Sequence, residues 1–316
     1  MTMTNICAPD FDLATTFDSG QVFHWEKLGD GFIGAIGDRP VYVEQCGDVL
    51  KVSDGEARTR SPRRPLPGII ADYFALDHPL AEICASFPND PVMTAAREFC
   101  RGLRIIRQPK WECLATFICS SMKQVAHIRQ ISRNLRDRFG QPGKIDPPTD
   151  GFAVANTHVV LTFPAAERIA ESSEKELRKY ALGYRAKNLL ATARLIASGD
   201  VDLEKLAALS DVDLRARLCE LPGVGAKVAN CVMLFAYERL RAFPIDVWIE
   251  RVLREKYFPR ARRLNAARLR EFTERYFGDH GGYAQQYLFH HARMKTRIKR
   301  KTNRKSGAGR LSPSQA

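Results

Sequence analysis

The segment Leu221–Lys227, with the sequence LPGVGAK, carries the residues whose types and spacing point most directly to chemistry. Gly223 and Gly225, separated only by Val224, allow a tight turn in which bare backbone N–H groups can approach an anion. A helix expected to begin at Ala226 adds a partial positive charge at the same place. The segment therefore predicts a phosphate-binding hairpin, although a plain turn between two helices would show the same pattern.

Lys227 is the candidate nucleophile. It falls in the first turn of an otherwise apolar helix, where the helix dipole and the loss of hydration both disfavour a cation. Both effects lower the pKa of a lysine, and only the neutral amine is nucleophilic. From an ordinary pKa of about 10.4, a fall of ~2 units would raise the neutral fraction roughly a hundredfold. The alternative is a hydrated lysine beside the phosphate site.

Asp246 is the second candidate. In the segment FPIDVWIE it follows Pro244 by two residues and occupies the position expected for the N-cap of the next helix. Capping alone stabilises a helix by about 1 kcal/mol and is the most frequent role of such an aspartate. A cap also keeps a carboxylate ionised, and an anion close to a lysine suits a reaction in which positive charge develops on a sugar.

The elements that must position these residues fall into two classes. Short runs rich in Val, Ile, Phe and Tyr, separated by Gly–Asp turns, predict an antiparallel meander at residues 31–36, 39–44 and 49–53. After a Pro-rich basic stretch at 60–68, apolar residues recur three or four positions apart, which predicts helices. We expect helices at 69–87, 91–103, 111–122, 125–139, 164–171, 185–198, 203–209, 211–219, 226–237, 247–257, 266–277 and 282–292.

The expected fold is thus α+β, with an N-terminal antiparallel β domain at residues 1–90 and an all-helical body at 91–292. A disordered basic tail is expected at 293–316, where the chain has nine basic residues and no acid. Such a tail is either a nonspecific phosphate-binding arm, which we favour, or a solubilising extension.

The composition of the chain limits the classes of function that it can have. The chain has 316 residues and a net charge of +13, which makes nucleic acid the leading class of partner. No apolar run approaches the ~18 residues of a membrane span, and the first residues do not resemble a secretory signal, so we expect an intracellular protein. Eight cysteines without any C-x-x-C pair indicate free thiols rather than a zinc or iron–sulfur site. We expect no metal and no required cofactor.

Several motifs in order then give a resemblance to a known family. They are SGQVFHW at Ser19–Trp25, YFALD at Tyr73–Asp77, CSS at Cys119–Ser121, GYRA at Gly183–Ala186, the hairpin region Leu221–Val252, and YAQQYLF at Tyr283–Phe289. Over residues 10–292 the sequence resembles the 8-oxoguanine DNA glycosylase/AP lyases of the helix-hairpin-helix-GPD superfamily, in a bacterial-type branch. The resemblance implies a helix-hairpin-helix catalytic body, and as partner a double-stranded DNA that contains 8-oxoguanine.

The resemblance also implies roles for individual residues. Lys227 would attack C1′ of the damaged nucleotide and form a Schiff base, after which β-elimination nicks the strand. Asp246 would stabilise the oxocarbenium-like sugar. Gly20 would offer its carbonyl oxygen to N7–H of 8-oxoguanine, a proton that guanine lacks. Phe289 and Cys231 would sandwich the flipped base, and Gln285 would read its Watson–Crick edge.

Further implied contacts concern the duplex. Tyr184 and Arg185 resemble residues that wedge into the helix and touch the orphaned base. Met122 and His127 stand where eukaryotic members have an Asn and an Arg that recognise the opposite cytosine, so we expect a looser preference for the opposite base. Trp248 stands where those members tend to have a His near a phosphate. The resemblance also allows a structural monovalent cation at the hairpin, and we expect a monomer.

Two other functions remain open at this point. Another glycosylase of the same superfamily is one, but no cysteine follows Cys231, which disfavours the iron–sulfur type, and alkylated-base enzymes generally lack a lysine at the position of Lys227. The other is a non-catalytic helix-hairpin-helix module that only holds phosphates, which would leave the set Gly20, Cys231, Gln285 and Phe289 without a purpose.

Overall fold

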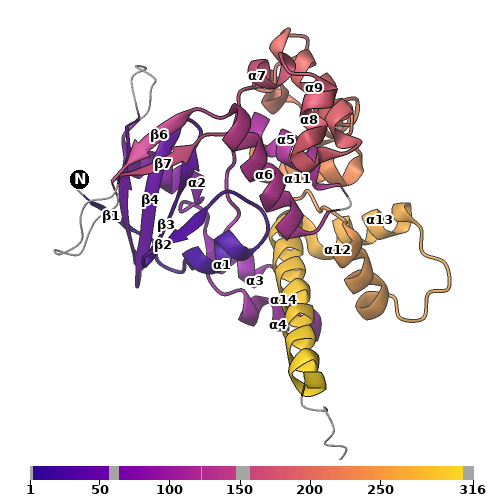
Figure 1. Cartoon of the computed structure of the whole chain (residues 1–316). Coiled ribbons are helices and arrows are strands. Elements are labelled where there is room, and N and C mark those ends of the chain that lie inside the picture. Colours follow the sequence, from indigo (N-terminus) through magenta and orange to yellow (C-terminus); the bar gives the residue numbers. More distant parts are fainter. Residues whose placement is uncertain (1–2, 57–63, 122, 147–156, 309–316) are drawn as a thin grey trace, which may run out of the picture.

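The computed structural model describes residues 3–56, 64–121, 123–146 and 157–308. An antiparallel sheet of five strands, in the order β1-β5-β4-β3-β2, forms one side of the molecule, and helices form the other (Figure 1). The strands are β1 (Thr4–Cys7), β2 (Glu26–Leu28), β3 (Gly31–Ile36), β4 (Arg39–Cys46) and β5 (Val49–Asp54). The predicted α+β class and the central meander are confirmed.

One face of the sheet is covered by helices from both sides of the meander. Alternating residues such as Val41 and Val43 of β4 are fully buried there, because successive side chains of a strand point to opposite faces. They pack with Phe17 from the helix α1 (Leu13–Asp18) and with Ile70 from the helix α2 (Leu66–Tyr73). The core of the β part therefore includes a helix from beyond the Pro-rich stretch.

The other face of the sheet carries a hairpin that the sequence did not predict. Strands β6 (Pro142–Ile145) and β7 (His158–Leu161) pair with each other, and Ile145 and Val160 pack on Ile33 and Tyr42 of the main sheet. The N–H of Glu56 donates to the carbonyl of Lys144 at 2.8 Å, which ties the hairpin to the end of β5. No strand was predicted at these residues, since strands this short are stabilised by distant partners. The boundary predicted at residue 90 stays a prediction.

The helical body follows most of the predicted windows, but helical segments at residues 174–182 lie where no helix was predicted. Its α-helices are α3 (Leu80–Ala85), α4 (Pro91–Phe99), α5 (Lys110–Ser120), α6 (Val125–Phe139), α7 (Ala166–Ala170), α8 (Glu174–Leu177), α9 (Arg185–Ala197), α10 (Asp211–Cys219), α11 (Ala226–Tyr237), α12 (Val247–Val252), α13 (Ala266–Phe277) and α14 (Gly281–Ala308). Four short segments in the described ranges have other helical forms. The π-helical segments are η1 (Arg178–Leu182) and η3 (Leu253–Tyr257), and the 3-10 helical segments are η2 (Lys205–Ala208) and η4 (Gly278–His280). One expected helix, 69–87, is divided into α2 and α3 because Ala75 has a positive φ of 48°.

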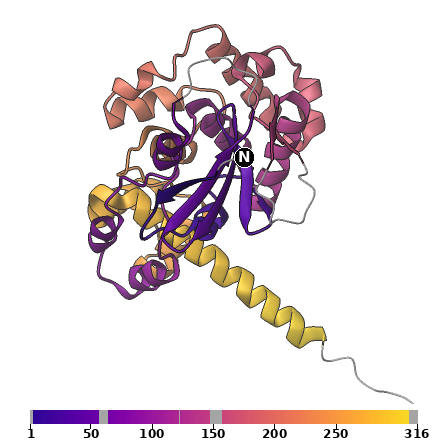
Figure 2. The same ribbon diagram turned by 90° about the vertical axis from the view of Figure 1, so that its left-hand side faces the viewer.

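Helix α14 is longer than predicted. It continues to Ala308 and projects from the body (Figure 2), whereas we expected disorder from residue 293. At the base of this projection Arg293 donates to the carbonyl of Asp18 and pairs with its carboxylate at 3.4 Å. Extending an existing helix costs far less than nucleating one, so a basic segment can continue a buried helix. Residues 309–316 lie outside the described part. No described helix is long and apolar enough to cross a membrane.

Candidate active site

The glycine hairpin joins α10 to α11, as the sequence predicted. Gly223 has a φ of +83°, and a Cβ there would lie 2.8 Å from the Cβ of Asn188, so both conformation and space require glycine. Thr192 of α9 donates to the carbonyl of Pro222 at 3.1 Å, while Val224 is buried and fixes the turn to the body. Gly225 is the exposed N-cap of α11 and supplies no side-chain cap, which leaves the first N–H groups of that helix available to an anion.

Lys227 is held at a defined place in the first turn of α11. Its Nζ donates to Oγ of Ser120, the last residue of α5, at 3.1 Å. The Ser120 hydroxyl itself donates to the carbonyl of Phe117 at 2.7 Å, so its lone pairs are free to accept from the amine. The amine also lies 5.1 Å from the centroid of the Phe117 ring. The half-buried Lys227 side chain is therefore directed to the end of α5.

Asp246 caps α12, as predicted. Its Oδ1 accepts from the N–H groups of Trp248 at 3.0 Å and Ile249 at 2.9 Å. Burial raises the pKa of this carboxyl above its ordinary value, and the cap bonds and the positive charge of Lys227 oppose that rise without cancelling it. The sequence indicated the cap but not the burial, which has the larger effect on the pKa.

Cys231 lies one turn beyond Lys227 on α11 and is buried. Burial raises the pKa of its thiol to about 11, with Lys227 lowering and Asp246 raising the value. The thiol is therefore neutral at physiological pH and offers a soft, apolar surface. Cys231 and Asp246 are thus both close enough to Lys227 for its positive charge to affect their pKa values.

Gly20 and Phe289 form a second group. Gly20 has a φ of +87°, and a Cβ there would lie 3.1 Å from Cε1 of Phe289 and 3.5 Å from Cγ2 of Val125. Gln285 lies one turn before Phe289 on α14 and is 4% exposed. Its Oε1 has no hydrogen-bond partner among the described residues. Buried acceptors are rarely left without a partner, so this oxygen is suited to a ligand that donates a hydrogen bond.

The loop that carries Gly20 is fixed to the helical body by Gln21. The amide of this buried residue accepts from the N–H of Ile106 at 2.7 Å and donates to the carbonyl of Arg104 at 2.8 Å. Two residues later, the ring of Phe23 packs edge-on against Phe117 with centroids 6.3 Å apart. Because Phe117 also contacts the Lys227 amine, the loop with Gly20 and the helix with Lys227 pack against the same side chain.

The two predicted wedge residues have different environments. Tyr184 is 55% exposed, as a residue that enters DNA must be. Arg185 is buried instead, because its guanidinium donates to the carbonyls of Ser121 and Leu182. It also lies 4.4 Å from the Tyr184 ring. In this structure Arg185 supports Tyr184 and is not itself open to DNA.

Two of the remaining predicted residues, His127 and Trp248, lie in the first turns of α6 and α12. His127 is exposed in the first turn of α6, and Trp248 is half-buried next to Asp246, with the Arg251 guanidinium 6.0 Å from its ring. Met122 lies outside the described residues. Within the described ranges, no group of three His, Cys, Asp or Glu side chains could hold a metal ion.

Ser120 is a contact of the candidate nucleophile Lys227 that sequence reasoning missed. The motif CSS was noted only as part of a resemblance, and nothing local connects Ser120 to a lysine 107 positions away. Only the packing of α5 against α11 shows that the serine hydroxyl accepts from the Lys227 amine.

Comparisons with known proteins agree over nearly the whole chain. Residues 4–114 match the 8-oxoguanine DNA glycosylase N-terminal domain, and residues 115–276 match the HhH-GPD superfamily of base excision DNA repair proteins. The "N-glycosylase/DNA lyase OGG1" of Arabidopsis thaliana is 31% identical, over 89% of this chain and 77% of that protein.

Two solved structures have nearly the same fold. One, "Structure of MBOgg1 in complex with low affinity DNA ligand", has a TM-score of 0.81 and 32% identity, and the match covers 94% of this chain and 100% of that one. The other is the Clostridium acetobutylicum 8-oxoguanine glycosylase/lyase with double-stranded DNA that contains cytosine opposite 8-oxoG. It has a TM-score of 0.80 and 27% identity, with 94% and 99% of the two chains covered.

Proposed function

Because the chain belongs to the HhH-GPD superfamily of base excision DNA repair proteins, we propose that Lys227 is the nucleophile with which it removes 8-oxoguanine from DNA. Its N-terminal part matches the 8-oxoguanine DNA glycosylase N-terminal domain, and several relatives that match most of its length are named as glycosylases that are also DNA lyases. The protein is therefore a bifunctional glycosylase and AP lyase. The observation that supports the role of Lys227 is the hydrogen bond that directs its amine to Ser120, together with the effect of its positive charge on the pKa of the partly buried Asp246 carboxyl.

The reaction would use these groups in sequence. The neutral Lys227 amine forms a bond to C1′ while the glycosidic bond breaks, and the bonding electron pair leaves with the base, which takes up a proton. The ionised Asp246 stabilises the positive charge that develops on the sugar, and the proton that the amine nitrogen loses after bond formation balances the proton that the departing base takes up. Ring opening gives a Schiff base, and loss of a proton from C2′ expels the 3′ phosphate.

Recognition of the flipped base would fall to the second group. The Gly20 carbonyl accepts from N7–H of 8-oxoguanine, while guanine would present an unprotonated N7 to that oxygen. The unpartnered Oε1 of Gln285 accepts from the Watson–Crick edge, and Phe289 and Cys231 contact the two faces. A non-catalytic DNA-binding module would have no use for a buried acceptor of this kind.

The proposed reaction also indicates the substrate, the oligomeric state and the cofactor needs of the protein. The substrate is double-stranded DNA with 8-oxoguanine, bound by the hairpin Gly223–Gly225, by Tyr184 and by the region of His127 and Trp248. We propose that the protein acts as a monomer, in the compartment that holds the genome. No step of the reaction uses a metal or a cofactor, and a monovalent cation at the hairpin would serve only to hold the turn.

Borohydride trapping tests the mechanism, because it reduces a Schiff base to a stable covalent bond. The unchanged protein should become covalently linked to a duplex that contains 8-oxoguanine. Lys227→Gln should give no linked product while still binding the duplex in a fluorescence-anisotropy titration. Lys205→Gln, a matched change at an exposed lysine paired with Asp202, should trap normally. Full trapping by Lys227→Gln would exclude the proposed nucleophile.

A further inference from the structure

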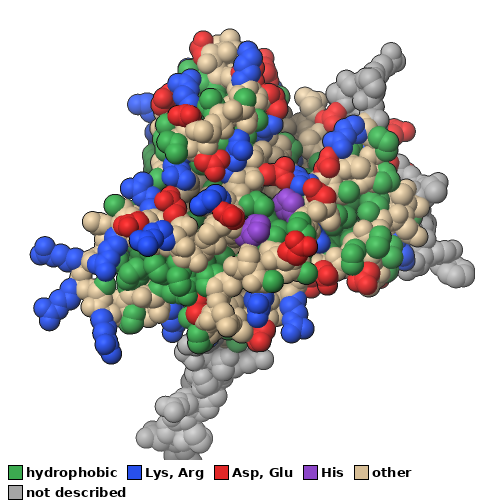
Figure 3. Space-filling model, turned by 180° about the vertical axis from the view of Figure 1, so that it is seen from behind, with side chains coloured by type: hydrophobic (Ala, Val, Ile, Leu, Met, Phe, Trp, Pro, Cys, Tyr) green, Lys and Arg blue, Asp and Glu red, His purple; other side chains and the backbone are tan. Residues whose placement is uncertain are grey.

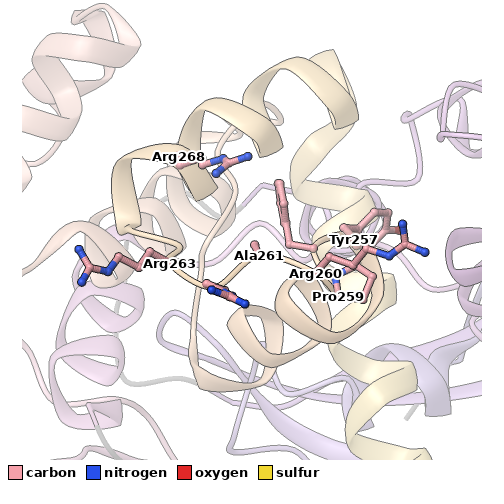
Figure 4. Close-up of a pocket in the computed structure, with 8 residues that line it drawn as sticks. Tyr257, Pro259, Arg260, Ala261, Arg263 and Arg268 are labelled. Atoms are coloured by element: carbon pink, nitrogen blue, oxygen red, sulfur yellow. The ribbon is translucent and has the colours of Figure 1, made fainter.

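A cavity of about 510 Å³ lies at the far end of the helix that Asp246 begins. Four arginines line it, together with the rings of Tyr257 and Phe258 (Figure 4): Arg260, Arg262, Arg263 and Arg268. Three of these arginines belong to the loop between η3 and α13, residues 258–265, and the fourth lies in the first turn of α13. We call these four residues the arginine loop. None of them belongs to the site described above.

Among the described residues, no acidic side chain neutralises the charges of the arginine loop. Nearby acids are already paired, Glu250 with Arg254 and Glu271 with Arg275. In the described ranges no ion pair within 4 Å involves Arg260, Arg262 or Arg263, which are all exposed. Arg268 lies over the Phe258 ring at 5.6 Å. An exposed cluster of unpaired like charges is unfavourable for folding, so a partner that supplies negative charge is expected.

The arrangement of the arginines indicates what kind of anion fits. Figure 4 places Arg260 and Arg263 on opposite sides of the loop and Arg268 on the neighbouring helix. In Figure 3, basic side chains project outward from the edge of the molecule that carries α12 and α13. A small anion needs guanidinium groups that converge on one point. Groups spread along an edge suit a polymer whose negative charges repeat along its length.

We propose that the arginine loop is a second DNA contact, which binds backbone phosphates of the duplex beyond the damaged nucleotide. This proposal rests on the proposed function. The helical segments α12 and η3, of six and five residues, separate Asp246 from the loop, which is a helix length of about 16 Å. At about 3.4 Å per nucleotide, a strand with its damaged nucleotide at Asp246 must extend at least about five nucleotides to reach the arginines. The contact lies on one side of the lesion only.

Asymmetric duplexes test this geometry. The variant Arg260→Ala/Arg262→Ala/Arg263→Ala is compared with the unchanged loop, both in the Lys227→Gln protein so that binding is measured without cleavage. Three duplexes of about 20 base pairs are used. One has the 8-oxoguanine at its centre, and the two end-placed duplexes have it about four pairs from one end or from the other end. The triple change should weaken binding to the centred duplex and to one end-placed duplex, but not to the other. The slope of log affinity against log salt should become shallower by up to about 2.7 on the affected duplexes, since each phosphate contributes about 0.9.

A control triple, Arg64→Ala/Arg168→Ala/Arg241→Ala, removes the same charge from arginines that are paired with Asp72, Glu171 and Asp279. It should leave the slopes unchanged. Equal weakening on both end-placed duplexes, an unaltered slope, or the same loss in the control would overturn the proposal. So would binding of inorganic pyrophosphate that depends on the arginine loop while binding of DNA does not, because the cavity would then be a small-anion site. The proposed function is tested separately, by trapping with Lys227 in place.

Discussion

Single residues at this site are placed by contacts that cross between elements. The Lys227 amine is held by a serine at the end of α5, and the partly buried carboxyl of Asp246 also caps α12. Lys227 and Asp246 could be predicted because a glycine turn and a helix start are local signals in the sequence. Ser120 and the burial of Arg185 could not, because each depends on a partner far along the chain or on packing that has no local pattern.

The double role of Asp246 can be separated by substitution with Asn, which caps a helix about as well as Asp. Asp246→Asn should therefore keep the melting temperature while lowering the single-turnover rate of base release by a factor of roughly 10² to 10³, because the negative charge is lost. In the unchanged protein the rate should fall on the acid side at a pH above about 3.9, the ordinary pKa of Asp, because burial raises the pKa. Quenched-flow measurement against pH checks both statements, and a normal rate for Asp246→Asn would exclude a catalytic charge.

At the scale of elements, a buried ionic cluster joins the β part to α5 and α6. Glu112 of α5 pairs with Arg136 of α6, and Nδ1 of His24 lies 3.3 Å from the same carboxylate. Since α5 also carries Ser120, this cluster fixes the helix that positions Lys227. Helices such as α6, α10, α11 and α13 were predicted to the residue because apolar spacing is a local property. The pairing of β1 with β5 and the β6–β7 hairpin depend on distant partners and were missed.

Breaking one side of this cluster should be costly. Arg136→Met leaves the Glu112 carboxylate buried without its partner, and we expect a loss of about 3–5 kcal/mol in the free energy of unfolding by urea. The double variant Glu112→Gln/Arg136→Met removes the uncompensated charge and should recover most of that loss. A double variant no more stable than Arg136→Met alone would show that the pair itself, and not the stranded charge, carries the stability.

At the scale of the whole molecule, the histidines make the stability depend on pH. Burial lowers the pKa of His24, His78 and His290, that of His290 to about 4. These side chains stay neutral in the folded protein while the same residues in the unfolded chain take up protons below about pH 6.5. The contribution of these histidines to the free energy of unfolding is therefore fully present above that pH and is lost as the pH falls toward 4. The raised pKa values of Glu112 and Asp246 act in the opposite sense at the acid end of this range.

Urea unfolding at several pH values between about 7.5 and 5 measures the effect. Each buried histidine should contribute up to about 1.4 kcal/mol per pH unit to the decrease below about pH 6.5. His290→Gln removes one such group, so the decrease should become shallower by up to that amount. A free energy of unfolding that does not change over this range would mean that the histidines titrate alike in both states.

The continuity of α14 has a mechanical consequence. One uninterrupted rod bears Gln285 and Phe289 near its inner end and the basic segment at its outer end, with no loop or glycine hinge between Phe289 and Lys305. A load applied to the outer end, whether a bound polyanion or an attached label, cannot be absorbed by a flexible joint. The load is transmitted along the helix toward Gln285 and Phe289, the residues proposed to contact the oxidised base.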